Sequence, residues 1–224
     1  MVLVVGAASA DGTSSELAIA RLTEQGLLDT SFGPQSDGRF HSAFGATDGI
    51  GFAVPEDPQG RVLFGGVSGV GGSGIGTTAP SWIVGRLLSN GTVDPGFTVQ
   101  QFQILPSTNV FYRQAVRDLA VQSDGRVVAA GNVFSGDSNR GDCFGAARFN
   151  DDGGFDASFG LSGVSYGDMS GLPDDIDDTA LSMVMGDGGL FVAGSTGLSN
   201  GGDSETRFSI AKLTIDRVFT NSFD

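Results

Sequence analysis

The sequence has only one cysteine, Cys143, one lysine, Lys212, and one histidine, His41. A single cysteine excludes an intrachain disulfide and any metal site built from several cysteines. No run approaches the ~18 consecutive apolar residues of a membrane-spanning helix, so we expect no membrane insertion. The first apolar run, residues 1–6, lacks the basic flank and the length of a signal peptide and is typical of a strand.

Basic residues are also scarce, and the formal net charge is −14. The chain carries 22 Asp and 4 Glu against 11 Arg and the one Lys. Such a surface repels nucleic acid and anionic lipid, which excludes both as main partners. The acidic excess serves either solubility or the binding of cations.

The chain repeats itself at intervals of about 64 residues. One motif joins an apolar run ending in a cation to a glycine turn and an Asp-x-Ser-Phe-Gly ending. Its copies span residues 17–33, 82–97, 144–160 and, in degenerate form, 208–223. The cations are Arg21, Arg86, Arg148 and Lys212, spaced by 65, 62 and 64 residues. A second motif, an apolar run ending in glycine, precedes each copy at residues 2–6, 61–66, 126–131 and 190–194.

Each apolar run is too short for a helix and is bounded by Gly, Asp or Asn, which indicates strands. Asn90-Gly91 and Asp124-Gly125 favour tight hairpin turns with positive φ at both central residues. A unit therefore reads as strand A, tight turn, strand B, long loop, strand C, tight turn and strand D. This predicts an all-β fold, a β-propeller or partial propeller of four repeated four-stranded antiparallel blades. The rival is a β-solenoid, whose coils usually repeat in fewer residues.

We expect one repeat domain over residues 1–224, with units at about 1–45, 46–110, 111–172 and 173–224. In this reading Met1 falls at the start of a B strand, and Asp224 falls just inside the last D strand. Exposed sheet edges invite association. We therefore expect either a piece of a longer array or a homodimer related by a two-fold axis.

The repeated residues resemble the delta-60 repeat family, which is assigned a β-propeller-like repeat of unknown function. The Asp-x-Ser-Phe-Gly endings at residues 29–33 and 156–160 carry this resemblance, which covers nearly the whole chain. Departures are Pro95-Gly96 in the second unit and Lys212 with Thr220 in the fourth. The resemblance implies a bacterial protein, often extracellular or on the cell surface, and no established activity.

Alternating strands would place the B–C and D–A connections on one face of the molecule, which we name the long-loop face. Long loops on a rigid scaffold are where binding and catalysis concentrate, whereas tight A–B and C–D turns would offer little surface. The long-loop face is expected to collect Asp11, Asp37, Asp48, Asp137, Asp142, Asp168, Asp174, Asp175, Asp177, Asp178, Asp203, Glu16 and Glu205. Ca²⁺ prefers such oxygen ligands, and the densest local group is Asp174, Asp175, Asp177 and Asp178. The alternative is a solvated acidic loop, because no EF-hand spacing is present.

Residues that recur once per unit are expected to be structural. Asp29, Asp94 and Asp156 repeat in step with Arg21, Arg86 and Arg148, which predicts an Arg–Asp pair or turn cap in each blade. Phe32, Phe97, Phe159 and Phe223 are expected to pack between blades. Cys143 is expected to be a small, half-buried apolar residue.

His41 does not repeat, and it is the candidate catalytic residue. It is expected in a long loop near Ser42 and Asp37, where an imidazole could act as a general base near neutral pH. The alternative is a solvated side chain. No serine lies in a Gly-x-Ser-x-Gly elbow.

Three functions fit these observations. The first is a binding or surface-interaction module that uses the acidic long-loop face, with an unknown small-molecule or surface ligand. The second is a Ca²⁺-dependent propeller hydrolase of the lactonase, phosphotriesterase or esterase type, in which the metal polarises the substrate oxygen. The third is a structural segment of a larger array.

Overall fold

The fold is built entirely from β-strands and their connections in the part of the chain that the structure describes. This computed structural model describes residues 1–9, 12, 14–44, 49–69, 80–104, 114–134, 142–167, 175–186, 189–200 and 203–213. Fourteen strands lie in these ranges and no helix does, which agrees with the strand-length apolar runs of the sequence. The described residues therefore contain no helix that could cross a membrane.

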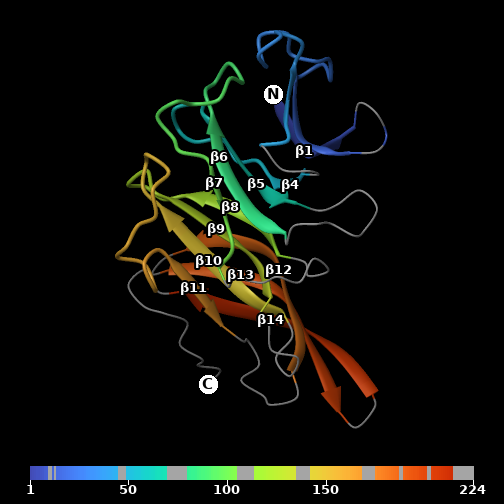
Figure 1. Cartoon of the computed structure of the whole chain (residues 1–224), viewed down its shortest axis with the longest axis vertical. Helices are drawn as coiled ribbons and strands as arrows, with labels where there is room; N and C mark the ends of the chain where they lie inside the picture. Colours follow the sequence, from blue (N-terminus) through green and yellow to red (C-terminus); the bar gives the residue numbers. More distant parts are fainter. Residues whose placement is uncertain are drawn as a thin grey trace.

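The strands form four antiparallel blades that follow one another along the molecule, with blade 1 at one end and blade 4 at the other (Figure 1). Blade 1 comprises β1 (Val2–Ala8), β2 (Glu16–Leu22) and β3 (Arg39–Ser42). Blade 2 comprises β4 (Gly49–Ala53), β5 (Val62–Ser68), β6 (Ser81–Leu87) and β7 (Gln100–Phe102). Blade 3 comprises β8 (Ala115–Val121), β9 (Val127–Phe134), β10 (Asp142–Phe149) and β11 (Val164–Gly167). Blade 4 comprises β12 (Asp175–Gly186), β13 (Gly189–Asn200) and β14 (Asp203–Leu213).

Pairing within each blade follows chain order, which confirms the predicted β-propeller architecture. Blades 3 and 4 share one sheet only because a single parallel bridge joins Asp142 of β10 to Asp177 of β12. The A strands are β4, β8 and β12, the B strands β1, β5, β9 and β13, the C strands β2, β6, β10 and β14, and the D strands β3, β7 and β11.

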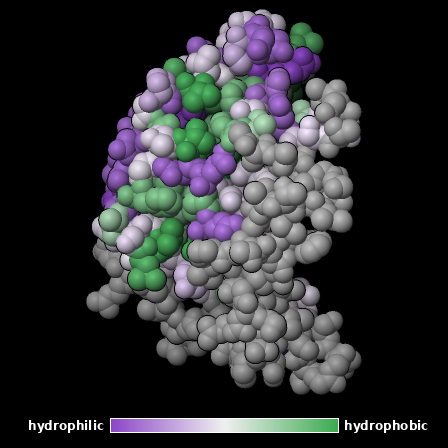
Figure 2. All heavy atoms as spheres, viewed as in Figure 1, coloured by the Kyte–Doolittle hydropathy of each residue, from purple (hydrophilic) through white to green (hydrophobic). Residues whose placement is uncertain are grey.

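The hydrophobic core lies between successive blades. Blades 1 and 2 meet around Leu17, Ile19, Phe32, Val62, Phe64 and Leu87. Blades 2 and 3 meet around Leu63, Trp82, Phe97, Val127 and Phe149. Blades 3 and 4 meet around Phe144, Ala146, Phe159, Leu190 and Val192. An inner blade is thus covered on both faces, and β6 is buried at every position from Trp82 to Leu87. On the outer surface of Figure 2, apolar and hydrophilic residues are interspersed along the described blades.

The D strands lie further along the chain than predicted. The apolar residues directly after Gly26, Gly91 and Gly153 make only isolated bridges, such as Leu22 with Leu28. The strands themselves begin at Arg39, Gln100 and Val164, in segments that were expected to be long loops. Three- or four-residue strands with polar positions carry too little alternation to be found from sequence.

The turn prediction is also wrong in its details. Of the pairs Asn90-Gly91 and Asp124-Gly125, only the glycines adopt positive φ, at 80° and 87°. Gly91 N donates to Leu88 O and Leu88 N donates to Thr92 O, which is a type I turn closed by a glycine bulge. The C–D connections as a whole span residues 23–38, 88–99 and 150–163 and are far from tight.

Candidate functional site

The predicted Arg–Asp pairs are present in the C–D connections of blades 1, 2 and 3. Arg21 Nε lies 2.8 Å from Asp29 Oδ2. The corresponding distances are 2.7 Å for Arg86 with Asp94 and 2.8 Å for Arg148 with Asp156. Each carboxylate also accepts the backbone N–H two residues on, from Ser31, Gly96 and Ser158. The paired-residue prediction is therefore confirmed.

Each of these arginines also lies over the phenylalanine of its own motif. The guanidinium carbon is 4.6 Å from the Phe32 ring centroid for Arg21, 4.8 Å from Phe97 for Arg86, and 4.9 Å from Phe159 for Arg148. All three rings are buried, as predicted. Phe223 lies outside the described residues. Carboxylate, guanidinium and ring thus form one packed unit in each of blades 1, 2 and 3, as expected of structural residues.

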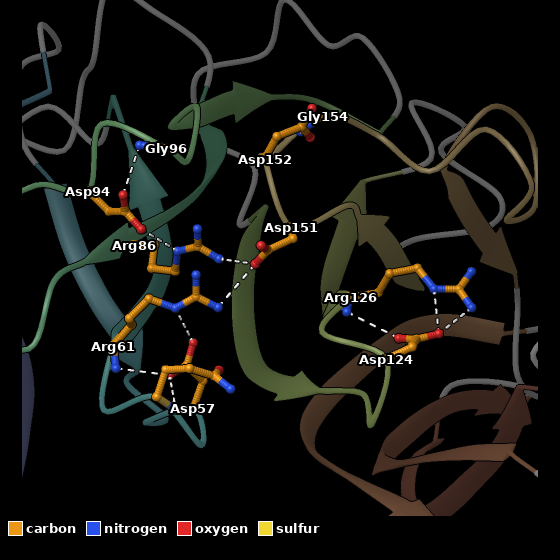
Figure 3. A network of polar contacts seen from close by, with 11 residues as sticks. Asp57, Arg61, Arg86, Asp94, Gly96, Asp124, Arg126, Asp151, Asp152 and Gly154 are labelled. Atoms are coloured by element: carbon orange, nitrogen blue, oxygen red, sulfur yellow. Dashed lines mark hydrogen bonds and ion pairs between the residues drawn. The ribbon is translucent and has the colours of Figure 1, made fainter.

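The same arginines fasten each blade to the next one. Arg21 Nη1 donates to the carbonyl oxygen of Ser89 in blade 2. Arg86 Nη1 donates to Asp151 Oδ1 of blade 3 at 2.5 Å, and Arg61 Nη2 reaches the same oxygen at 3.1 Å (Figure 3). Main-chain bonds accompany them: Gly33 N donates to Asn90 O at 2.9 Å, and Thr98 N donates to Asp152 O at 2.8 Å. The C–D connections therefore hold neighbouring blades together, and we call such contacts between blades joints.

Charge pairing at these joints shifts pKa values. Burial tends to raise the pKa of Asp156, but hydrogen bonds from Ser158 and Arg126 and the charge of Arg148 outweigh it, so the pKa lies below its ordinary value. Asp124 and Asp156 raise the pKa of Arg126 above its ordinary value through hydrogen bonds. Burial likewise tends to raise the pKa of Asp151, but hydrogen bonding and charge from Arg86 lower it overall, with Arg61 contributing.

His41 lies in β3 rather than in a loop, opposite Ala18 of β2. Its Nδ1 is 2.5 Å from Glu16 Oε2, and both side chains are exposed to solvent. Asp37, the predicted neighbour, instead accepts from Arg39 N at 3.0 Å. His41, Arg39 and Val4 line a hollow of about 290 Å³ on the outer face of blade 1. A role for His41 as a general base stays a prediction.

The acidic segment divides into a described part and a part that lies outside it. Asp174 lies outside the described residues, and only the backbones of Asp175 and Asp177 are placed, in β12. Asp178 is fully buried, and its Oδ1 accepts a 2.7 Å hydrogen bond from Thr196 Oγ1. The hydroxyls of Thr196 and Ser209 are in turn 2.5 Å apart. Asp178 thus has a buried partner that the sequence did not reveal.

Metal ligation at the long-loop face is not tested by the described residues. Among them, no three His, Cys, Asp or Glu side chains gather where they could hold an ion. Asp11, Asp48, Asp137 and Asp168 lie outside the described ranges, as does Asp174. Ca²⁺ therefore stays a prediction. Cys143 is fully buried in β10, not half-buried as expected.

One feature that the sequence analysis missed is a row of β-bulges in the A strands. The register shifts between Gly51 and Ala53 in β4, between Val116 and Asp118 in β8, and between Ala180 and Ser182 in β12. Bulges re-aim side chains and often adjoin functional sites. Here they bring Arg117 over the Phe52 ring of blade 2, at 4.4 Å.

The bulge in blade 3 also reaches blade 4. Asp118 Oδ2 accepts from Ser182 Oγ at 2.9 Å and from Met183 N at 2.7 Å. A sequence signal exists for the Arg117–Phe52 contact, because Phe52 and Arg117 each precede a repeated glycine, Gly66 and Gly131, by 14 residues. The bulge row is thus a further set of joints between blades.

One known family supports this architecture. Residues 1–32 and 122–159 match the family described as "Domain of unknown function (DUF5122) beta-propeller". Both stretches are similar to a β-propeller family. Each holds the B and C strands of one blade and its Arg–Asp–Phe connection. No curated protein matches the chain. The narrower resemblance to delta-60 repeats stays a prediction.

Proposed function

We propose that this β-propeller chain is a binding or surface-interaction module that holds cationic ligands on its long-loop face. The main support for this proposal is that the opposite face of the molecule is taken up by contacts between blades. There the C–D connections are occupied by contacts between blades, from Arg21 to Ser89 and from Arg86 to Asp151. At the long-loop face, Gly49 N of blade 2 donates to Ser15 O of blade 1, but the joints of the C–D connections leave the rest of that face for a ligand.

The charge of the long-loop face supports a cationic ligand. By sequence, its connections carry Asp11, Asp48, Asp137, Asp168 and Asp174. The same connections contain only two basic residues, Arg113 and Arg140. Clustered carboxylates repel one another unless a cation or solvent compensates, and Ca²⁺ takes six to eight oxygen ligands. Asp178 offers no carboxylate to a ligand at this face, because its side chain is buried against Thr196.

Thermal unfolding with and without millimolar CaCl₂, at matched ionic strength in NaCl, tests the proposal. A cation that binds only the folded chain raises its melting temperature. We expect this rise in the wild type and its loss when Asp174 and Asp175 are both changed to Asn. The matched control is Glu56→Gln with Asp152→Asn, which removes two carboxylates from the opposite face and should keep the rise.

Two outcomes would contradict the proposal. Equal melting temperatures in CaCl₂ and in NaCl would show that the acidic loops are merely solvated. Turnover of ester or phosphotriester substrates that a chelator abolishes would favour the metal-dependent hydrolase instead.

A further inference from the structure

The outer face of blade 1 exposes residues that every other blade buries. The four B strands can be aligned by sequence on the glycines that end them, which are Gly6, Gly66, Gly131 and Gly194. At the positions two and four residues before these glycines, Val62, Phe64, Val127, Ala129, Leu190 and Val192 are at most 3% exposed, because the preceding blade covers them. In blade 1 the same positions are Val4 and Val2, which are 49% and 54% exposed.

The outer face of blade 4 shows the complementary exposure. The four C strands can be aligned by sequence on the basic residue of each repeat. The residues two and four positions before that basic residue face the following blade. These are Leu17, Ile19, Trp82, Val84, Phe144 and Ala146 in blades 1 to 3, at most 1% exposed. In blade 4 they are Phe208 and Ile210, which are 75% and 47% exposed.

The inner junctions show how such faces fit together. A large C-strand side chain of one blade lies on a small residue of the next. Phe144 covers Gly194, where a Cβ would lie 2.7 Å from its ring. Trp82 lies over Gly145, where a Cβ would be 3.4 Å from its ring, and donates from Nε1 to Asn132 O at 2.9 Å.

Blade 1 holds the matching small residues in an open hollow. Gly6 corresponds to Gly194 and Ala18 corresponds to Gly145, and both line the hollow of about 290 Å³. Phe208 occupies the position of Phe144 and Trp82. The side chain that blade 4 exposes is therefore the one that this hollow would receive.

The C–D connections of blades 4 and 1 also carry complementary charges. Arg86 reaches forward to Asp151 of the next blade, and Arg21 reaches forward to Ser89. The residue of blade 1 that corresponds to Asp151 and Ser89 is Glu24, which is exposed. The residue of blade 4 that corresponds to the arginines is Lys212, also exposed, so opposite charges face each other when blade 4 meets blade 1.

We propose that two copies of this chain join head to tail, with the blade 4 face of each against the blade 1 face of the other. Phe208 of one copy lies in the hollow over Gly6 and Ala18 of the other, and Lys212 lies beside Glu24. Two such junctions related by a two-fold axis close a ring and leave neither face exposed. The contact continues the blade-to-blade packing already present three times within the chain.

Complementation of two variants tests this arrangement. Val4→Asp damages the blade 1 face and Phe208→Asp damages the blade 4 face, so neither variant can form a sound junction with itself. A mixture keeps one sound junction, between Phe208 of the first variant and Val4 of the second. By light scattering at micromolar concentration, we expect the wild type at twice its 22.9 kDa chain mass. Each variant alone should stay at 22.9 kDa, and the mixture should regain the double mass.

The control is Leu161→Asp, at a residue that is 65% exposed on blade 3, and it should keep the double mass. Circular dichroism checks that every variant keeps a β-sheet spectrum, and Ala18→Trp, which fills the hollow, replaces Val4→Asp if that variant does not fold. A wild-type mass of 22.9 kDa, or one above twice that value, overturns the proposal. So does a mixture of folded variants that stays monomeric. If one variant alone keeps the double mass, the copies pair through like faces, which also overturns it.

Discussion

Arg148 and Asp156 combine two stabilising contacts in one buried place. Arg148 is 2% exposed, its Nε is 2.8 Å from Asp156, and its guanidinium lies over Phe159. Removing one partner of a buried ion pair leaves an uncompensated charge and costs about 3–5 kcal/mol. Because Asp156 keeps its hydrogen bond from Arg126, we expect Arg148→Ala to lower the free energy of unfolding by about 3 kcal/mol, the lower end of that range.

A double-mutant cycle in urea measures the coupling between these two residues. Since either single change already breaks the pair, the free-energy losses of Arg148→Ala and Asp156→Ala should not add, and the coupling should exceed about 1 kcal/mol. Additive losses would mean that the two side chains act independently.

The lowered pKa of Asp156 predicts acid sensitivity. An unfolded Asp titrates at about 3.9, so below that value the unfolded chain binds a proton that folded Asp156 still lacks. The stabilisation from Asp156 is therefore complete at neutral pH and is lost as pH falls from about 5 through the folded pKa. In urea titrations over this range, Asp156→Asn should show a shallower loss of stability than the wild type. Equal slopes would mean that the ionised Asp156 carboxylate does not stabilise the fold.

At the scale of elements, the C–D connection determines how blades meet. Gly91 and Gly153 have φ of 80° and 82°, and a Cβ on them would lie 2.4 Å from Gly33 N and from Thr98 O of the preceding blade. Gly26 occupies the same turn position in blade 1 with φ of 78°, and a Cβ there would meet nothing within 4 Å. Glycine is thus required at all three turns because φ is positive. At Gly91 and Gly153 it is also required because a side chain would collide with the preceding blade.

This contrast gives a matched pair of substitutions. Gly26→Ala and Gly153→Ala both impose left-handed strain of about 1–2 kcal/mol. Gly153→Ala also forces a methyl group into Thr98 of blade 2, and such overpacking adds about 1–3 kcal/mol. We expect urea unfolding to show the larger loss for Gly153→Ala. Equal losses would contradict the docking of this turn on blade 2.

The sequence predicted elements where alternation or repetition was strong. The runs around Arg21, Arg86 and Arg148 repeat in register, so the B and C strands and the Arg–Asp pairs were predictable. The D strands were not, because Gln100–Phe102 offers three residues without alternation, whereas apolar Leu27 and Leu28 imitate a strand after Gly26. The Asp178–Thr196 contact was also hidden, because it depends on the register of β12 against β13.

In the part of the chain that the structure describes, the blades form a row in which neighbouring faces pack together and the two end faces do not pack against a blade. Val2 and Val4 at one end and Phe208 and Ile210 at the other carry apolar surface that the three inner junctions bury. Burying apolar surface is the main favourable contribution to protein association. If two copies cover these ends, unfolding also separates the copies, and stability then depends on protein concentration.

The melting temperature therefore provides a second measure of assembly, independent of mass. Each tenfold rise in concentration favours a dimer by about 1.4 kcal/mol, or about 0.7 kcal/mol per chain. For a chain of 224 residues this corresponds to a rise of about 1.5–3 °C per tenfold. We expect that rise in the wild type and in Leu161→Asp, and a constant melting temperature in Phe208→Asp. A wild-type melting temperature that stays constant over a hundredfold range would show that the ends of the row do not pair, because only a change in the number of particles on unfolding produces the dependence.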